Sequence, residues 1–292
     1  MIEINGVTKR YQTLVAIDDV SLKIIPGEVI GILGPNGAGK TTLFRLITGS
    51  LNPDSGRIQS IGQSWPTIGY KPERLLFPSD MRVRKYLSMM ASLSNLRGKE
   101  AERAVQQGLA NVDLLDAADK KIKQCSKGMR QRLALAQALI GKPSLLLLDE
   151  PSNGLDPEGQ SDICRLIKQL QRRGITIVLA SHQLAEVTQV CTHLLILNKG
   201  SIHYESSMQD ALAERPHTSI EVDRELFSLT PLLESLHPEI EIKPESREIV
   251  LNHEAIALRP QVLSMLLSAG YDIIQIQQSY VTLAEIYAEA VN

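Results

Sequence analysis

The apolar positions of the first 210 residues form short, uninterrupted runs that alternate with longer helix-forming segments. The runs occur at residues 29–33, 144–150 and 175–180, and such runs are typical of parallel strands that are buried on both faces. Between them lie segments such as residues 130–139, whose composition favours a helix. This alternation predicts an α/β fold with a mostly parallel core sheet that is covered on both faces.

Residues 1–62 show a second pattern, in which apolar and polar positions alternate. A period of two predicts half-buried strands, so we expect an antiparallel β part at the N-terminus. Residues 78–141 are more polar and have helical spacing, which predicts a helical subdomain. The alternating apolar positions at the N-terminus are Ile2, Ile4, Val7, Val20, Leu22 and Ile24.

The pattern changes again at Pro216, after which four short alternating segments are separated by two predicted helices. The order β-α-β-β-α-β predicts a small ferredoxin-like α+β domain, followed by an amphipathic helix at residues 282–290. We therefore expect a large domain over residues 1–213 and a small accessory domain over 217–292, with a regulatory or dimer-contacting role. The segments lie near 220–222, 240–242, 249–251 and 274–276, and the helices near 226–236 and 257–269.

The composition is that of an ordinary globular protein and argues against several classes. Of the 292 residues, 43% are apolar and 22% are charged, and a net charge of −2 gives no electrostatic footprint for nucleic acid. No segment approaches 18 uninterrupted apolar residues, and the first residues lack the basic and apolar leader of a signal peptide. The three cysteines lie far apart without metal-binding spacing, which suits reduced thiols in the cytosol.

Residues 34–41 read GPNGAGKT and match the phosphate-binding pattern G-x-x-x-x-G-K-[ST]. Because the loop follows a predicted strand and precedes a predicted helix, a glycine-rich turn that binds nothing is a poor alternative. Glycines let backbone N–H groups wrap around an anion, and the helix N-terminus adds partial positive charge. We expect Lys40 to reach the β- and γ-phosphates of a nucleoside triphosphate and the Thr41 hydroxyl to bind Mg²⁺. The expected nucleotide-binding residues of this segment are Gly34, Pro35, Asn36, Gly37, Ala38, Gly39, Lys40, Thr41 and Thr42.

A pair of carboxylates, Asp149 and Glu150, ends the second apolar run. Ligands of open α/β sheets bind at the carboxyl ends of the strands, so both side chains should emerge beside the phosphates. We expect Asp149 to hold Mg²⁺ and Glu150 to polarise the attacking water as the general base. Two carboxylates that only cap a strand end are the alternative, which is common for one acidic residue but not for such a pair behind four leucines.

A second anion site is predicted where residues 125–129 run into a helix. There Ser126 and Gly128 would offer a hydroxyl group and backbone N–H groups at a helix N-terminus. The third apolar run ends in another polar pair, Ser181 and His182.

These segments together resemble the nucleotide-binding subunit of an ATP-binding-cassette (ABC) transporter, a P-loop NTPase, over about the first 210 residues. The resemblance identifies residues 34–41 as the Walker A motif and residues 145–150 as the Walker B motif. It likewise identifies residues 125–129 as the signature motif, which the helical subdomain carries, and residues 153–156 as the D-loop.

The resemblance also implies roles for single residues. His182 corresponds to the switch histidine, which acts in catalysis with Glu150 and Lys40. Tyr11 stands where the family places the aromatic ring that stacks on adenine, and Asp156 belongs to the nucleotide-binding set. Ser126 and Gly128 would close over ATP that is held by the opposite subunit of a dimer.

Two positions depart from the family pattern. The signature is commonly Leu-Ser-Gly-Gly-Gln, and here Lys127 replaces the first glycine in CSKGM. Glu73 stands where the family has a glutamine that contacts Mg²⁺ and couples to the membrane domain. Its carboxylate can offer an oxygen ligand to Mg²⁺ but cannot donate a hydrogen bond. Both variants resemble a bacterial branch of exporter-type and efflux ATPases.

The resemblance implies an ATP-hydrolysing motor subunit that powers transport, with export favoured by the branch. Its partners would be a separate integral membrane permease and a second nucleotide-binding subunit, either identical or a sister protein, at the cytoplasmic face of the membrane. Substrate specificity would lie in the membrane subunit. A soluble ABC protein of DNA repair or translation is one alternative, but the chain lacks a second cassette, a long heptad run and a C-x₂-C pair. A non-hydrolysing ATP sensor is another, which the retention of Lys40, Asp149, Glu150 and His182 opposes.

A loop after Glu73 places Leu75, Leu76 and Phe77 in succession before Pro78. These side chains either pack against the helices of their own subdomain or, together with Arg82 and Arg84, form the rim of a groove. Such a groove would receive a short cytoplasmic helix of the membrane partner.

Overall fold

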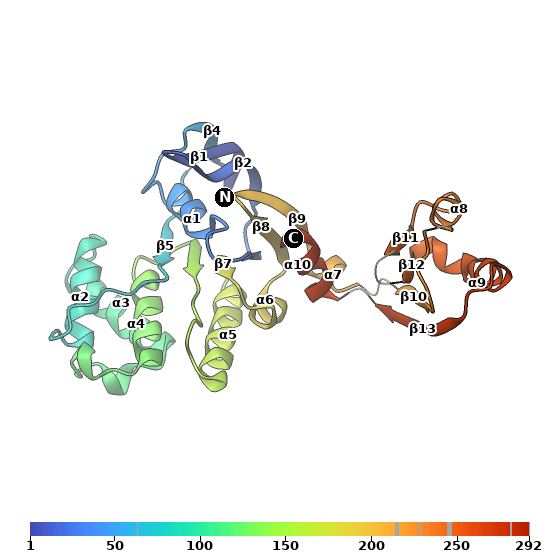
Figure 1. Cartoon of the computed structure of the whole chain (residues 1–292). Coiled ribbons are helices and arrows are strands. Elements are labelled where there is room, and N and C mark those ends of the chain that lie inside the picture. Colours follow the sequence, from blue (N-terminus) through green and yellow to red (C-terminus); the bar gives the residue numbers. More distant parts are fainter. Residues whose placement is uncertain (63, 214–215, 228, 244–246, 281, 292) are drawn as a thin grey trace. The chain divides into compact units, whose positions relative to one another are not determined.

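The computed structural model describes residues 1–62, 64–213, 216–227, 229–243, 247–280 and 282–291. The chain forms two compact units, Met1–Ala211 together with Tyr287–Asn292, and Leu212–Ile286 (Figure 1). Each unit has its own cluster of buried apolar side chains. None of the helices in these described ranges is long and apolar enough to cross a membrane.

A six-stranded sheet with the order β5-β6-β7-β3-β8-β9 forms the centre of the larger unit. The first five strands are parallel, and only β9 runs antiparallel to its neighbour. The leucines of β6 are fully buried, because helices cover both faces of such a sheet. This confirms the mostly parallel core. The strands are β3 (Val29–Leu33), β5 (Ile68–Lys71), β6 (Leu145–Asp149), β7 (Thr176–Ser181), β8 (His193–Asn198) and β9 (Ser201–Ser207).

The N-terminal part forms the expected antiparallel sheet, with the order β2-β1-β4. Its strands are β1 (Ile2–Tyr11), β2 (Leu14–Ile24) and β4 (Ser55–Ser60). Ile4 pairs with Leu22 in the register of β1 and β2. All six alternating apolar positions are buried, and they share one cluster with residues of β3 and of the helix that follows it. The apolar residues of the period-two pattern therefore lie on the side of this sheet that faces the core.

Helices α1, α5 and α6 pack against the central sheet, and three other helices from the middle of the chain form a group of their own. The group comprises α2, α3 and α4, drawn in green shades beside one another in Figure 1, and it is the expected helical subdomain. The helix α4 begins after Ser126, whose Oγ accepts a hydrogen bond from the N–H of Met129 at 3.2 Å. The helices of the unit are α1 (Lys40–Ile47), α2 (Val83–Leu93), α3 (Gly98–Asn111), α4 (Lys127–Leu139), α5 (Pro157–Arg172), α6 (Leu184–Val190) and α7 (Met208–Ala211), with 3₁₀ turns η1 (Leu115–Ala117) and η2 (Ile122–Gln124).

In the loop between β5 and α2, one apolar side chain packs against the helical subdomain and another is exposed. The ring of Phe77 is half-buried and lies 5.2 Å from the ring of Tyr86 in an edge-to-face arrangement. Leu76, in contrast, is 92% exposed. Phe77 therefore packs on its own subdomain, because Tyr86 faces it from α2, and only Leu76 of this pair is free to contact a partner.

The smaller unit contains a four-stranded antiparallel sheet with the order β11-β12-β10-β13. Helices α8 and α9 occur between strands, so the elements follow one another as β-α-β-β-α-β, the order of a ferredoxin-like unit. Ile220 of β10 and Leu251 of β12 are fully buried in its core. The elements are β10 (Pro216–Val222), α8 (Thr230–Glu234), β11 (Ile240–Lys243), β12 (Glu248–Asn252), η4 (His253–Leu258), α9 (Arg259–Ser268) and β13 (Ile273–Tyr280).

The end of the last helix, α10 (Leu283–Val291), belongs to the larger unit, whereas the apolar pattern assigns it to the accessory domain. The side-chain amide of Asn198 is buried and donates to the carbonyl oxygens of Ala290 at 3.3 Å and Val291 at 2.9 Å. The last carbonyls of a helix have no partner within the helix. Asn198, at the end of β8, supplies that partner and holds the helix end against the larger unit.

Candidate functional site

The loop between β3 and α1 has a backbone that only glycine allows at two positions. A Cβ atom at Gly34 would lie 2.3 Å from the carbonyl oxygen of Leu197 in β8. Gly39 has a φ of +110°, and a Cβ there would lie 2.4 Å from the carbonyl oxygen of Ala16. These close approaches set the loop tightly against its neighbours, as a backbone cradle for phosphate groups requires.

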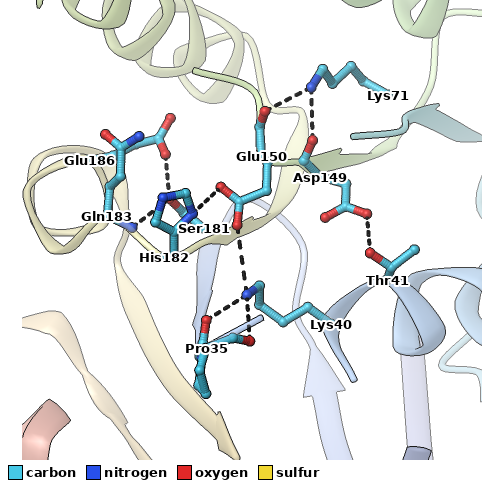
Figure 2. A network of polar contacts seen from close by, with 11 residues as sticks. Pro35, Lys40, Thr41, Lys71, Asp149, Glu150, Ser181, His182, Gln183 and Glu186 are labelled. Carbon is cyan, nitrogen blue, oxygen red and sulfur yellow. Dashed lines mark hydrogen bonds and ion pairs between the residues drawn. The ribbon is translucent and has the colours of Figure 1, made fainter. Parts of the chain in front are cut away.

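Lys40 is the first residue of α1, and its side chain folds back over the loop (Figure 2). Its Nζ donates to the carbonyl oxygens of Gly34 at 2.6 Å and Pro35 at 3.2 Å, and it lies 3.7 Å from Oε1 of Glu150. Burial lowers the pKa of Lys40, while the neighbouring carboxylates of Glu150 and Asp149 act against that shift. The ammonium group is thus held at the mouth of the loop, where an anion would meet it.

The Thr41 hydroxyl group donates to Oδ2 of Asp149 at 2.7 Å, which joins the start of α1 to the end of β6. Burial is the main cause that raises the pKa of Asp149, and this hydrogen bond acts against it. The two side chains place hard oxygen atoms side by side, the donor type that Mg²⁺ prefers.

Glu150 follows directly after β6, and its carboxylate lies beside the side chains of His182 and Lys40. Its Oε2 lies 2.8 Å from Nδ1 of His182, and the side chain of Glu150 is 6% exposed against 45% for His182. The backbone of Glu150 has a φ of +47°. A non-glycine residue in this left-handed region costs on the order of 1–3 kcal/mol and persists where surrounding contacts hold it.

One pocket of about 450 Å³ collects most of the expected nucleotide residues. It brings together the loop of residues 35–39, the start of α1, the two Walker B carboxylates, His182, Tyr11 and Glu73. Gly34 lies behind the pocket, where it packs against β8. The lining residues are Tyr11, Leu14, Ala16, Pro35, Asn36, Gly37, Ala38, Gly39, Lys40, Thr41, Thr42, Glu73, Asp149, Glu150, Asn153 and His182.

Ser126, Gly128 and Asp156 do not line this pocket, and they lie together in a second hollow. The hollow is also about 450 Å³ and combines the N-termini of α4 and α5. Asp156 caps α5 by accepting a hydrogen bond from the N–H of Gly159 at 3.0 Å. Lys127 is exposed and lies over Gly154, so close that a Cβ there would meet its Nζ at 1.7 Å. Within one chain, the expected ATP contacts are therefore divided between two separate sites.

Several residues that line the pocket are absent from the set of ligands expected from the sequence, among them Asn153, the first residue of the expected D-loop. Asn153 lines the nucleotide pocket from the turn after β6, and Leu14 and Ala16 line it beside Tyr11. Lys71 is fully buried beneath the carboxylates, and burial lowers its pKa to about 8. In the sequence, only the position of Lys71 directly before Pro72 marks it as unusual.

A resident metal site of protein ligands alone is absent from the described ranges, since no three His, Cys, Asp or Glu side chains cluster there as ligands would. Mg²⁺ is usually bound through one or two carboxylates together with substrate phosphates and water. Asp149, Thr41 and Glu73 offer oxygen atoms that fit such a shared site.

Comparison with known proteins gives the same family from sequence and from fold. Residues 17–153 match a family model described as ABC transporter. The chain is 31% identical to YxlF, described as an ABC transporter ATP-binding protein of Bacillus subtilis, with 100% of both chains covered. It is 36% identical to the Nod factor export ATP-binding protein I of Burkholderia thailandensis, with 68% of each chain covered.

Solved structures share the fold of the larger unit. A dimeric structure of MJ0796, a bacterial ABC transporter cassette, superposes with a TM-score of 0.65 at 25% identity. The match covers 71% of this chain and 99% of that one.

Proposed function

This chain belongs to the ATP-binding subunits of ABC transporters, and we propose that it drives export through a separate integral membrane subunit by closing as a dimer around ATP. Binding and hydrolysis of ATP to power transport are the activities of its family. The observation that carries the assignment of single residues is the joint presence of Lys40, the Thr41–Asp149 pair and the Glu150–His182 pair in one pocket.

The loop of residues 34–39 holds the phosphates with its N–H groups, at the N-terminus of α1. Lys40 then exchanges its carbonyl partners in the loop for the β- and γ-phosphate oxygens. Tyr11 is 40% exposed at the rim of the same pocket, so its ring is available for stacking on the adenine base.

Asp149, Thr41 and Glu73 are the residues that would hold Mg²⁺ together with the phosphates. When bound, the ion neutralises charge on the β- and γ-phosphate oxygens. The Thr41–Asp149 hydrogen bond orients both oxygen donors in advance. Glu73 is exposed, and its approach to the site would link nucleotide binding to the loop that bears Leu76.

Glu150 is the general base that orients and polarises the attacking water. Its carboxylate is almost fully buried, which keeps bulk water from competing for it. His182 contacts the opposite carboxylate oxygen from the one nearest Lys40, so the two neighbours fix the plane of the carboxylate. The imidazole is also within the pocket, where it can hydrogen-bond the γ-phosphate.

The division of ATP contacts between two hollows supports a dimer as the active form. A second copy, or a sister subunit, would bring its Ser126, Gly128 and Asp156 over the nucleotide held by the first. The dimeric structure of the related cassette MJ0796 favours this arrangement. ATP then acts as an interface ligand, whose binding stabilises the closed dimer by mass action.

Export and the membrane partner rest on the relatives and on the two departures from the family pattern. One relative is named for Nod factor export. Glu73 and Lys127 are the two positions at which the sequence resembles the exporter-type branch. The cytoplasmic face of the membrane is then the site of action, reached through the permease.

The proposal is tested by purifying the tagged chain from detergent-solubilised membranes of its source organism. We expect one integral membrane protein to co-purify in a fixed ratio and to change the rate of ATP hydrolysis. Recovery of ribosomes or DNA in its place would contradict the transport role. Uptake of candidate compounds into inside-out vesicles that contain the complex would then establish export.

A further inference from the structure

Lys71 is a fully buried lysine that the assignment of the nucleotide site leaves without a role. It ends β5, and its Nζ donates to the carbonyl oxygen of Asp149 at 2.8 Å and to that of Glu150 at 2.9 Å (Figure 2). These two carbonyls belong to the peptide groups on either side of the Cα atom of Glu150. One ammonium group therefore fixes both peptide planes that define the backbone angles of Glu150.

The local sequence explains why a side chain takes this place. The ladder between β5 and β6 ends at the pair Lys71 and Leu148. Pro72 follows, and proline has no N–H to extend the ladder. Buried carbonyl groups need donors, and the lysine supplies them beyond the end of the strand.

The conformation that the lysine holds is one that the chain does not adopt by itself. Glu150 has a φ of +47°, in the left-handed region that side chains disfavour. On the far side, the N–H of Glu150 donates to the carbonyl of Ala180 in β7 at 2.9 Å. Lys71 of β5 and Ala180 of β7 thus hold the backbone of Glu150 from the strands on either side of β6. The carboxylate of Glu150 consequently lies between His182 and Lys40.

We propose that Lys71 is a positioning residue for ATP hydrolysis, whose ammonium group holds the backbone of Glu150 in the left-handed conformation that aims its carboxylate at the attacking water. The inference rests on the proposed role of Glu150 as the general base. The carbonyl oxygens of Asp149 and Glu150 give the buried ammonium group two acceptors, as a buried polar group requires.

Lys71→Met removes the ammonium group, and with it both hydrogen bonds, while keeping an unbranched apolar chain as far as Cε. Because a displacement of about 1 Å can cost on the order of 100-fold in rate, we expect kcat to fall by about 10- to 100-fold. The contacts of the phosphate loop are unchanged, so affinity for ATP should stay within about threefold. The variant should also accumulate as an ATP-bound dimer on size-exclusion chromatography, because it binds ATP and fails to turn it over.

Two further variants separate positioning from loss of stability. Thr176→Val removes a fully buried hydroxyl from the opposite end of β7, where it accepts from the N–H of Gly27 at 2.9 Å. It should lower the melting temperature and leave kcat within about twofold of wild type. Lys71→Gln keeps a donor on a shorter side chain and should lose less kcat than Lys71→Met. If Lys71→Met does not fold, Lys71→Gln compared with Thr176→Val carries the test.

The decisive measurement is a double-mutant cycle of Lys71→Met with Glu150→Gln. If Lys71 acts only through Glu150, the double variant turns over ATP at the rate of Glu150→Gln within about threefold. A further loss of tenfold or more, or a normal kcat in the Lys71 variants, overturns the positioning role while the base assignment stands. A normal rate for Glu150→Gln alone refutes the base assignment, and with it the role of Lys71.

Discussion

Nδ1 of His182 lies 2.8 Å from Oε2 of Glu150, which joins the carboxyl ends of β7 and β6. These strands are neighbours in the central sheet, with Asp149 paired to Ala180. The contact links the proposed base to a partly exposed imidazole at the pocket mouth, where a γ-phosphate would be bound. A movement of His182 when the site closes around ATP would therefore be transmitted to Glu150 through one hydrogen bond.

Replacing the proposed base, Glu150, should separate ATP binding from ATP turnover. Glu150→Gln keeps the shape of the side chain but removes its negative charge, so we expect turnover to fall by about 10²–10⁴-fold, the usual range for general-base catalysis. ATP binding should be preserved, and an ATP-bound dimer should appear on size-exclusion chromatography. A variant that hydrolyses ATP at the normal rate would show that another group is the base, with His182 the next candidate.

Replacing the P-loop lysine should instead reduce binding and turnover together. Lys40→Ala removes a charged contact to the phosphates that is made before and during hydrolysis. A hydrogen bond to a charged group contributes about 1.5–3 kcal/mol, so ATP affinity should weaken by about 10- to 100-fold. Titration with a fluorescent ATP analogue measures this loss, and AMP, which lacks the β- and γ-phosphates, serves as the matched ligand control. Unchanged ATP affinity would contradict the assigned contact.

The positions of the central strands can be predicted from the sequence, because strands that are buried on both faces consist almost entirely of apolar residues. The apolar run 29–33 coincides with β3, and the carboxylates after the four leucines of β6 emerge in the pocket, as the position of ligands at strand ends predicts. Walker A, Walker B and His182 converge for the same reason, since their strands are parallel and adjacent.

Other features depend on pairings that no local pattern encodes. Apart from its position before Pro72, the sequence does not distinguish Lys71 from a surface lysine, and the pairing of β5 with β6 directs its side chain toward the backbone of Glu150. The end of α10 has an ordinary amphipathic pattern, and its attachment to the larger unit depends on the distant Asn198. Phe77 and Leu76 are adjacent and similarly apolar, yet the position of Tyr86 determines which of them is covered.

The division of the ATP contacts between two hollows predicts complementation between inactive variants. A Cβ at Gly128 would make only ordinary contacts, at 3.7 Å from Leu155, so Gly128→Glu should fold. The new carboxylate would repel the γ-phosphate held by the opposite subunit. Gly128→Glu and Lys40→Ala should each be inactive alone, because every site in each homodimer carries one defect.

A mixture of the two variants forms heterodimers in which one of the two sites has an intact loop and an intact signature. Random pairing makes half of the dimers mixed, so the rate should rise toward about a quarter of the wild-type value. The ATPase rate of the mixture, compared with the sum of the separate rates, measures the effect. A mixture that equals this sum would show that the signature does not act on the partner's nucleotide.

Contact with the membrane subunit should depend on Leu76, which is 92% exposed in the loop that follows Glu73. An exposed apolar side chain in the segment that leads to Arg82 and Arg84 suits a surface that receives a short helix. Leu76→Asp adds a charge without disturbing buried contacts, so ATP hydrolysis by the isolated subunit should stay within about twofold of wild type. Recovery with detergent-solubilised membranes should fall strongly.

Leu93→Asp, at a leucine that is 73% exposed at the end of α2, is the matched control and should be recovered normally. Equal recovery of both variants would place the contact with the membrane subunit elsewhere, whereas equal loss would indicate a general effect of added charge on the helical subdomain.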